Sequence, residues 1–198
     1  VKQLTSEKYI TERLRLYNPD SAGNSISIQA GVAQKESEET THFSVVDNKG
    51  NAVSVTTTLN GGYGSYTVVG GAGFLLNNEM DDFSVKPGVP NMYGAVGGEA
   101  NAIEPGKRML SSMTPTIVLK NKKTYIVTGT PGGTTITTSV YQTLLNLIDF
   151  KLSTEDAVNK PKFHMQWLPD TIFMEDDFPD DIVSGLQKMG YNVSKRGK

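Results

Sequence analysis

Threonine and glycine dominate the middle of this chain, and their placement constrains the fold more than any other feature. Each occurs 20 times in 198 residues, and most of both lie between residues 40 and 140. Threonine favours strands, whereas dense glycines favour loops over packed strand interiors. We therefore expect short strands separated by long glycine-rich loops. A length of 198 residues fits one domain with one core.

Two hairpins are predicted in this middle region. Residues 42–47 and 52–59 are β-branched runs that flank a polar turn. Residues 116–119 and 125–128 form a second pair of the same kind. The intervening glycines and prolines predict loops, apart from a short strand near residues 74–76.

Helices are expected on both sides of the hairpins. Apolar spacing and capping residues predict them at residues 5–17, 136–148, 153–160 and between Pro179 and Gly190. Residues 193–198 are predicted to begin a strand that has no partner in this sequence. Strands in one run and helices in the next favour an α+β fold over alternating βαβ units.

Composition excludes several classes of function. The net charge of −2 provides no field for nucleic acid, and no apolar run reaches the length of about 18 residues that a membrane helix needs. The absence of cysteine excludes disulfides and thiolate metal sites. His42 and His164 are the only histidines, which leaves little material for a His-rich metal site or a conventional Ser-His-Asp triad. We expect no metal and no cofactor.

The chain changes character at Thr40. Residues 18–39 are polar and end in an acidic run, which is typical of an exposed linker accessible to cleavage. Cleavage after Glu39 would expose the Thr40 α-amine, whose pKa near 8 lets it accept the hydroxyl proton in place of a histidine. From spacing alone, the Thr40-Thr41 pair is better explained by the preference of strands for β-branched residues.

Several blocks of sequence stand out along the chain, in the order 40–47 with 50–54, 73–83, 110–116, 129–133 and 161–164. In this order they resemble the blocks of the γ-glutamyltranspeptidases, a family of N-terminal nucleophile hydrolases. Residues 1–39 resemble the C-terminal end of the family's large subunit, and residues 40–198 resemble its small-subunit catalytic region without the final strands. The resemblance implies an αββα sandwich, with two facing sheets covered by helices, that is incomplete in this sequence.

The resemblance implies catalytic roles for four residues. Thr40 matches the nucleophile that cleaves the Glu39–Thr40 bond and then attacks the γ-carbonyl of a γ-glutamyl amide to form a threonine ester. Thr58 matches the threonine that hydrogen-bonds this nucleophile, although without the resemblance it is an ordinary strand residue. Gly132 and Gly133 match the pair whose backbone N–H groups form the oxyanion hole.

The resemblance also implies binding residues for the α-ammonium and α-carboxylate of the glutamyl group. Asn60, Glu79 and Asp82 match positions that hold the ammonium, while Ser111 and Ser112 match hydroxyls that bind the carboxylate. Without the resemblance, the Asp81-Asp82 pair is better explained as part of a solvated turn.

Tyr93 matches a tyrosine that pairs with the Asn60 position to close a lid; alone, it would be interpreted as surface packing. Met109 and Thr130 stand where the family usually has proline and serine, but both only flank contact residues. The arginine that grips the substrate carboxylate in this family is expected upstream of Val1.

The implied function is transfer of a γ-glutamyl group from glutathione or a related amide to an amino acid, a peptide or water, after autocatalytic cleavage of a zymogen. The implied partners are these small molecules and the remainder of the large subunit, with a periplasmic or secreted location. The alternatives are a relative that acts on poly-γ-glutamate or a β-lactam side chain, and an inactive binding domain of the same fold. The isolated fragment is expected to be inactive because Glu39 blocks the Thr40 amine.

Overall fold

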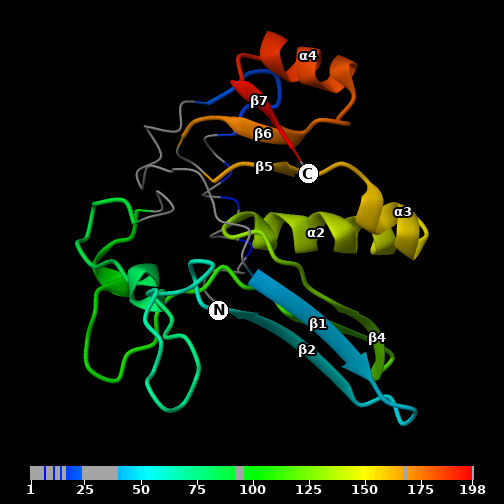
Figure 1. Ribbon diagram of the computed structural model, residues 1–198. Coiled ribbons are helices and arrows are strands. Elements are labelled where there is room, and N and C mark those ends of the chain that lie inside the picture. The colour runs from blue at the N-terminus through cyan, green and yellow to red at the C-terminus, as the bar shows by residue number, and fades with distance from the viewer. Residues whose placement is uncertain are drawn as a thin grey trace.

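The computed structural model describes residues 7, 11, 14, 17–23, 40–91, 96–166 and 169–197. In these residues, strands and helices alternate in successive layers, with two hairpins at one end and a three-stranded sheet toward the other (Figure 1). A helical layer lies between them. Long loops extend from the hairpin end of the molecule and carry two short 3-10 helices, Glu79–Asp82 and Glu99–Asn101.

The two predicted hairpins are confirmed. Strand β1 (Thr40–Val46) pairs antiparallel with β2 (Ala52–Thr58), and β3 (Thr116–Lys120) pairs antiparallel with β4 (Lys123–Thr128). Side chains join the two hairpins, because the Ser54 hydroxyl donates to the Thr128 carbonyl at 3.0 Å and the Thr124 hydroxyl donates to the Gly50 carbonyl at 2.9 Å. This attachment holds the end of β4 beside the first hairpin.

The core surrounds helix α2 (Thr135–Ile148), which packs against the shorter helix α3 (Thr154–Asn159). Ile136 and Val140 of α2 are 1% and 3% exposed. The two residues are four positions apart, so they lie on one face of α2, and that face is buried. Burial of this face fixes the turn that precedes the helix. The Ser153 hydroxyl accepts the Asp156 backbone N–H and caps α3, as the sequence predicts.

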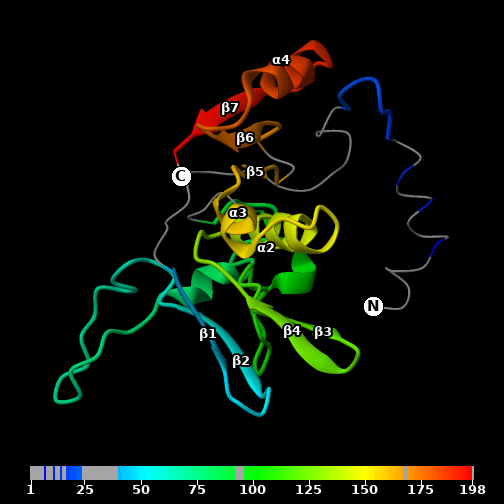
Figure 2. The same ribbon diagram turned by 90° about the vertical axis from the view of Figure 1, so that its right-hand side faces the viewer.

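The second sheet corrects one prediction and adds two strands. Strand β6 (Ile172–Glu175) pairs antiparallel with β5 (Phe163–His164) and parallel with β7 (Val193–Arg196). The prediction that residues 193–198 lack a partner is therefore wrong, because β6 was not anticipated from its four residues. Helix α4 (Asp180–Lys188) connects β6 to β7 as a crossover that lies beyond the sheet (Figure 2).

The layer order refines the expected architecture. The α+β class is confirmed, and in the described residues α2 lies between the hairpins and the β5–β7 sheet (Figures 1 and 2). The predicted strand at residues 74–76 is reduced to an isolated bridge between Val68 and Leu75. Glycines on both sides of this bridge prevent a longer ladder.

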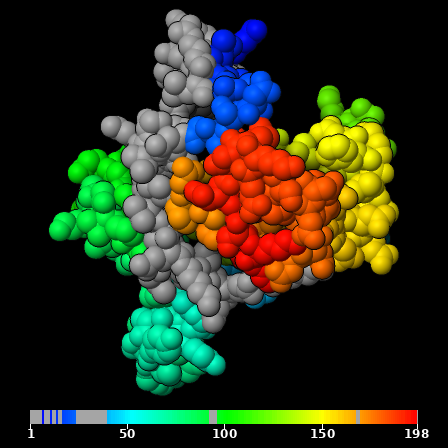
Figure 3. Space-filling view, turned by 90° about the horizontal axis from the view of Figure 1, so that it is seen from above, coloured from blue at the N-terminus to red at the C-terminus, as the bar shows by residue number. Residues whose placement is uncertain are grey.

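Residues 17–23 lie beside the C-terminal sheet. In the view from above, they are next to α4 and β7 (Figure 3), and the Ala22 N–H donates to the Met189 carbonyl at 2.8 Å. The predicted helix at residues 5–17 falls mostly outside the described residues, as does the linker up to Glu39. Within the described part of the chain, no helix is both long enough and apolar enough to span a bilayer.

Candidate active site

A cavity of about 140 Å³ lies where the first hairpin, two loops and the start of α2 meet. It brings together most of the residues that sequence reasoning singled out. Its lining consists of Thr40, Thr58, Asn60, Asp82, Asn91, Leu110, Ser111, Ser112, Met113, Gly133, Thr134 and Ile136. Gly132 and Glu79 lie outside this lining, and Tyr93 and Glu39 lie outside the described residues.

Thr40 and Thr58 face each other across the first hairpin. They are the terminal pair of the β1–β2 register. Side chains of directly opposite residues have their Cβ atoms about 4.5–5.5 Å apart. The Thr58 Oγ1 accepts the Asn60 backbone N–H at 2.9 Å, and its own hydrogen is not used in that bond. The register therefore places a hydroxyl donor within reach of the Thr40 side chain.

Asn60 enters the cavity through an unusual backbone turn. Its φ is 73°, in the left-handed region that asparagine tolerates better than most residues. The side chain is 8% exposed, and its amide nitrogen donates to the Asn78 carbonyl at 3.2 Å. The Asn78 side chain in turn accepts the Gly61 N–H at 2.8 Å. This turn fixes the Asn60 amide beside Thr58.

The turn before α2 presents backbone donors. Gly132 and Gly133 have φ values of 133° and 58°, and a Cβ on Gly132 would lie 2.7 Å from the Thr135 hydroxyl oxygen. Their carbonyls accept the Thr135 and Ile136 N–H groups, at 3.1 and 3.3 Å. Among the described residues, neither glycine N–H has an acceptor. Since these donors precede the positive end of a helix, the turn suits a developing oxyanion.

Ser111 and Ser112 differ in what their hydroxyls do. The Ser112 hydroxyl donates to the Gly133 carbonyl at 3.0 Å, which ties its loop to the glycine turn. The Ser111 oxygen accepts the Met113 N–H at 3.2 Å, and its hydrogen is not used in that bond. Ser111 is therefore the better placed of the two to donate to a carboxylate, while Ser112 supports the turn.

Carboxylates crowd the opposite side of the cavity. Asp82 has its pKa raised to about 6, chiefly because burial disfavours its charge and then because Glu79 and Asp81 are close. The pKa of Glu79 is also raised by burial. The Asn91 amide donates to the Asp81 carbonyl at 3.3 Å and brings a neutral polar group into the lining. A cation placed here would relieve the repulsion among these acids.

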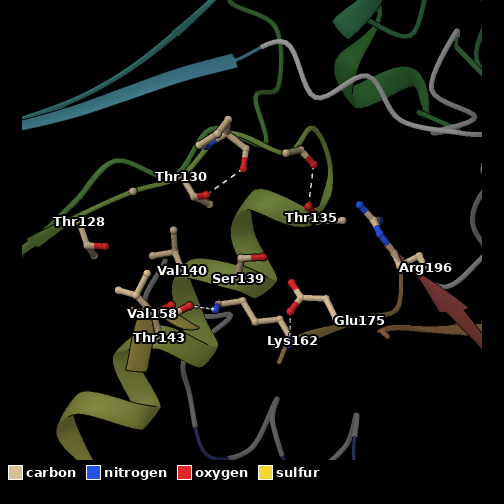
Figure 4. A pocket seen from close by; sticks show the side chains of 13 residues that line it. Thr128, Thr130, Thr135, Ser139, Val140, Thr143, Val158, Lys162, Glu175 and Arg196 are labelled. Atoms are coloured by element: carbon tan, nitrogen blue, oxygen red, sulfur yellow. Dashed lines mark hydrogen bonds between the residues drawn. The ribbon is translucent and has the colours of Figure 1, made fainter. Parts of the chain in front are cut away.

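A second cavity, of about 330 Å³, adjoins the same glycine turn (Figure 4). Gly132 and Thr135 line it, together with Lys162, Glu175 and Arg196. Glu175 accepts the Lys162 backbone N–H at 3.0 Å, and the Lys162 ammonium donates to backbone carbonyls of the α3 end. The Lys162 ammonium is therefore mostly engaged in hydrogen bonds within the protein. In the described chain, no cluster of three or more acidic or histidine side chains could hold a metal.

Sequence reasoning missed several residues of the cavity. Leu110 and Met113 flank the serine pair, and Thr134 and Ile136 begin α2, so their position beside predicted site residues was a usable signal. Asn91 carried no signal beyond its place in a long loop. Whether Gly132, Glu79 and Tyr93 contribute to binding or catalysis stays a prediction.

Comparison with solved structures identifies the fold class. The structure aligns with cephalosporin acylase from Bacillus halodurans, with a TM-score of 0.77 and 26% identity, over 100% of this chain and 33% of that one. It also aligns with Helicobacter pylori γ-glutamyltranspeptidase, with a TM-score of 0.76 and 58% identity, over 79% of this chain and 84% of that one. The predicted fold of the N-terminal nucleophile hydrolases is confirmed.

The whole sequence, residues 1–198, matches the family model described as gamma-glutamyltranspeptidase. It is 50% identical over 192 residues to the glutathione hydrolase proenzyme of Escherichia coli strain K12, covering 96% of this chain and 33% of the relative. The chain belongs to the γ-glutamyltranspeptidase family. It spans about a third of the length of the curated relatives that it matches.

Proposed function

We propose that these residues form the catalytic part of a longer γ-glutamyltransferase and glutathione hydrolase precursor. The observation that carries the proposal is the meeting of four groups in one cavity: the opposed Thr40 and Thr58 hydroxyls, the Gly133 turn and the Asp82 carboxylate. A nucleophile, a hydroxyl partner, an oxyanion site and an acid for an ammonium group are the parts that γ-glutamyl transfer requires.

In the proposed first step, the Thr40 hydroxyl attacks the Glu39 carbonyl, and hydrolysis of the resulting ester separates Glu39 from Thr40. The freed Thr40 amine then serves as the base, since an α-amino pKa near 8 allows it to accept the hydroxyl proton at neutral pH. Before this cleavage, the same nitrogen is an amide and cannot act as a base. The uncleaved chain is therefore proposed to be inactive.

In the proposed transfer, Thr40 Oγ1 forms a bond to the γ-carbonyl of the donor while its proton passes to the α-amine. The N–H groups of Gly132 and Gly133 stabilise the oxyanion, and its collapse expels the amine, which takes the proton. The product is a γ-glutamyl ester of Thr40. Attack by an amino acid, a peptide or water regenerates the hydroxyl, giving a ping-pong sequence.

The two ends of the glutamyl group are proposed to bind at opposite sides of the cavity. Asp82, supported by Glu79 and Asn60, receives the α-ammonium, whose charge favours the ionised form of a carboxyl whose pKa is raised by burial and then by Glu79 and Asp81. Ser111 donates to the α-carboxylate, and Ser112 contributes through the glycine turn. Tyr93 is proposed to close over the bound donor from its loop.

A covering partner is proposed for the first hairpin. Phe43 and Val45 point to one face of β1 and are 48% and 54% exposed. Exposed apolar patches of this kind mark interfaces. We propose that the remainder of the large subunit covers them and supplies the carboxylate-binding arginine. A periplasmic or secreted location is proposed from the family resemblance alone, and cell fractionation tests it.

The test uses the full-length precursor that contains these residues. The unaltered protein is expected to cleave before Thr40 and to release the anilide from a γ-glutamyl anilide, whereas Thr40→Ala loses both reactions. Thr41→Ala, on the adjacent exposed position, is the matched control and should retain both. Intact mass gives the cleavage and absorbance gives the turnover. Cleavage and turnover that persist in Thr40→Ala would indicate an inactive binding domain or a different nucleophile.

An acylase for β-lactam side chains is the second candidate, favoured by the alignment with cephalosporin acylase over the whole chain. The two candidates differ in the need for an α-ammonium on the donor. Parallel assays with a γ-glutamyl anilide and with a glutaryl anilide, which lacks the ammonium, separate them. Preference for the glutaryl compound would favour the acylase.

A further inference from the structure

His164 is a buried histidine for which the proposed reaction has no use. It lies on β5, is 6% exposed, and does not line the cavity that contains Thr40. Its ring nevertheless contacts the beginning of α2, immediately after the glycine turn. Buried polar rings are costly unless every nitrogen has a partner, so these contacts define what the ring does.

The hydrogen bonds define the protonation of the ring. His164 Nε2 lies 2.8 Å from the Gln166 side-chain oxygen, which can only accept, so the neutral ring carries its hydrogen on Nε2. Nδ1 is then the acceptor, 2.9 Å from the Thr138 hydroxyl, whose hydrogen it shares with the Thr135 carbonyl.

The other nitrogen faces the glycine turn. His164 Nε2 donates to the Gln166 side-chain oxygen at 2.8 Å, and the Thr134 hydroxyl donates to the same oxygen and lies 3.4 Å from Nε2. Thr134 follows Gly133 directly and lines the Thr40 cavity. One imidazole thus contacts the last residue of the turn on one side and the first turns of α2 on the other.

We infer that His164 is a positioning residue that holds the Gly133–Thr134 peptide in the orientation needed for oxyanion binding. This inference rests on the proposed function of the turn. A small rotation of that peptide would redirect the Gly133 N–H, and donors in an oxyanion hole act only when aimed at the developing charge. The effect of the ring therefore appears in kcat and leaves ground-state binding nearly unchanged.

The charged surroundings keep the ring neutral. Arg196 of β7, Lys162 before β5 and Glu175 of β6 line a small cavity with His164, and three of these residues are visible in Figure 4. Helix α2 contributes no acid or base to this contact. Burial lowers the pKa of His164, and the Arg196 charge lowers it further, although the Gln166 hydrogen bond opposes this. Protonation in acid would turn Nδ1 from an acceptor into a donor and disturb its contact with Thr138 in the first turn of α2.

The experiment compares variants of the processed full-length enzyme. His164→Ala removes both ring contacts, while His164→Asn retains a hydrogen-bonding group near the position of Nδ1 and should recover part of the loss. Gln142→Ala is the matched control: Gln142 joins the same helix to β5, through Phe163 at 2.7 and 3.1 Å, and does not reach the turn. All three are assayed well below their melting temperatures, for kcat, KM and the pH profile.

His164→Ala is expected to lower kcat about 10-fold or more with KM changed less than about twofold, and to alter the acidic limb of the kcat profile. Gln142→Ala should lower the melting temperature without either change. Equal kcat losses in His164→Ala and Gln142→Ala, or no recovery in His164→Asn, overturn the inference. Should the unaltered enzyme lack γ-glutamyl turnover, the amide resonances of Gly133 and Thr134 decide: shifts in His164→Ala but not in Gln142→Ala support the positioning role, and unchanged resonances refute it.

Discussion

The two sides of the Thr40 cavity are built by different means. The hydroxyl side, made of Thr40, Thr58 and Gly133, rests on a strand register and a helix start, both fixed by backbone hydrogen bonds. On the acidic side, Asp82 lines the cavity and shares a 3-10 helix in a long loop with Glu79 and Asp81; burial, and then these neighbouring charges, raise the pKa of Asp82. The proposed reaction chemistry thus lies on regular elements and the proposed charge recognition on a loop, so the two can be perturbed separately.

Thr58→Val should produce the largest effect on the hydroxyl side. Valine keeps the shape of threonine and its fit to the strand but cannot donate to Thr40. We expect kcat to fall about 100-fold, because hydroxyl-assisted proton transfer contributes at least that much, while KM changes little. Steady-state kinetics on a γ-glutamyl anilide measure both.

The control for this variant is Thr57→Val. Thr57 is exposed, pairs with Thr41 in the same hairpin and projects from the opposite face of β2. A similar loss of kcat in Thr57→Val would mean that β2 tolerates no change, and that Thr58 has no particular role.

Asp82→Asn should produce the corresponding effect on the acidic side, and it should appear in KM. Losing one charge-assisted hydrogen bond to the donor ammonium costs about 2 kcal/mol, or about a 30-fold rise in KM. Because only the ionised carboxylate attracts the ammonium, KM of the unaltered enzyme should also rise as the pH falls below the Asp82 pKa of about 6. Initial rates between pH 5 and 8 measure this.

Asp81→Asn separates the direct contact between Asp82 and the ammonium from the effect of the neighbouring negative charge. Asp81 does not line the cavity, although its charge raises the Asp82 pKa. Its substitution should shift the pH dependence of KM toward lower pH with little change at pH 8. If Asp81→Asn raises KM at pH 8 as much as Asp82→Asn does, the ammonium is held by the field of the whole loop and not by Asp82.

The two serines connect the two sides and should separate in their kinetics. Ser111→Ala removes a donor that is available to the substrate carboxylate, so KM should rise about five- to tenfold. Ser112→Ala removes the bond to the Gly133 carbonyl, so the loss should be in kcat, by a similar factor. The reverse assignment would show that the bound substrate rearranges this loop.

The sequence predicted the hydroxyl side better than the acidic side, for physical reasons. β-branched runs with a polar turn define a hairpin and, through it, the pairing of Thr40 with Thr58. The cavity also includes Asn91, which reaches it through a loop without periodicity, so no local signal could place it. Strand β6 escaped prediction because four residues carry too little pattern, and its parallel pairing with β7 depends on the long-range crossover through α4.

The smallest expected effect concerns the free energy of unfolding. Its dependence on pH should distinguish the acidic side of the cavity from the hydroxyl side. The Asp82 pKa rises from 3.8 to about 6 on folding, so the folded protein binds this proton more tightly than the unfolded chain does. Asp82 therefore destabilises the fold above pH 6, and this cost is removed as the pH falls from 6 toward 3.8.

Asp82→Asn should raise the free energy of unfolding by about 1 kcal/mol at pH 8, a value reduced for solvent screening, and by almost nothing at pH 4. Thr58→Val carries no such titration, so any stability change it causes should be equal at both pH values. Urea unfolding at pH 4 and pH 8 tests this, and a pH-independent difference for Asp82→Asn would mean that packing, not charge, governs the acidic side.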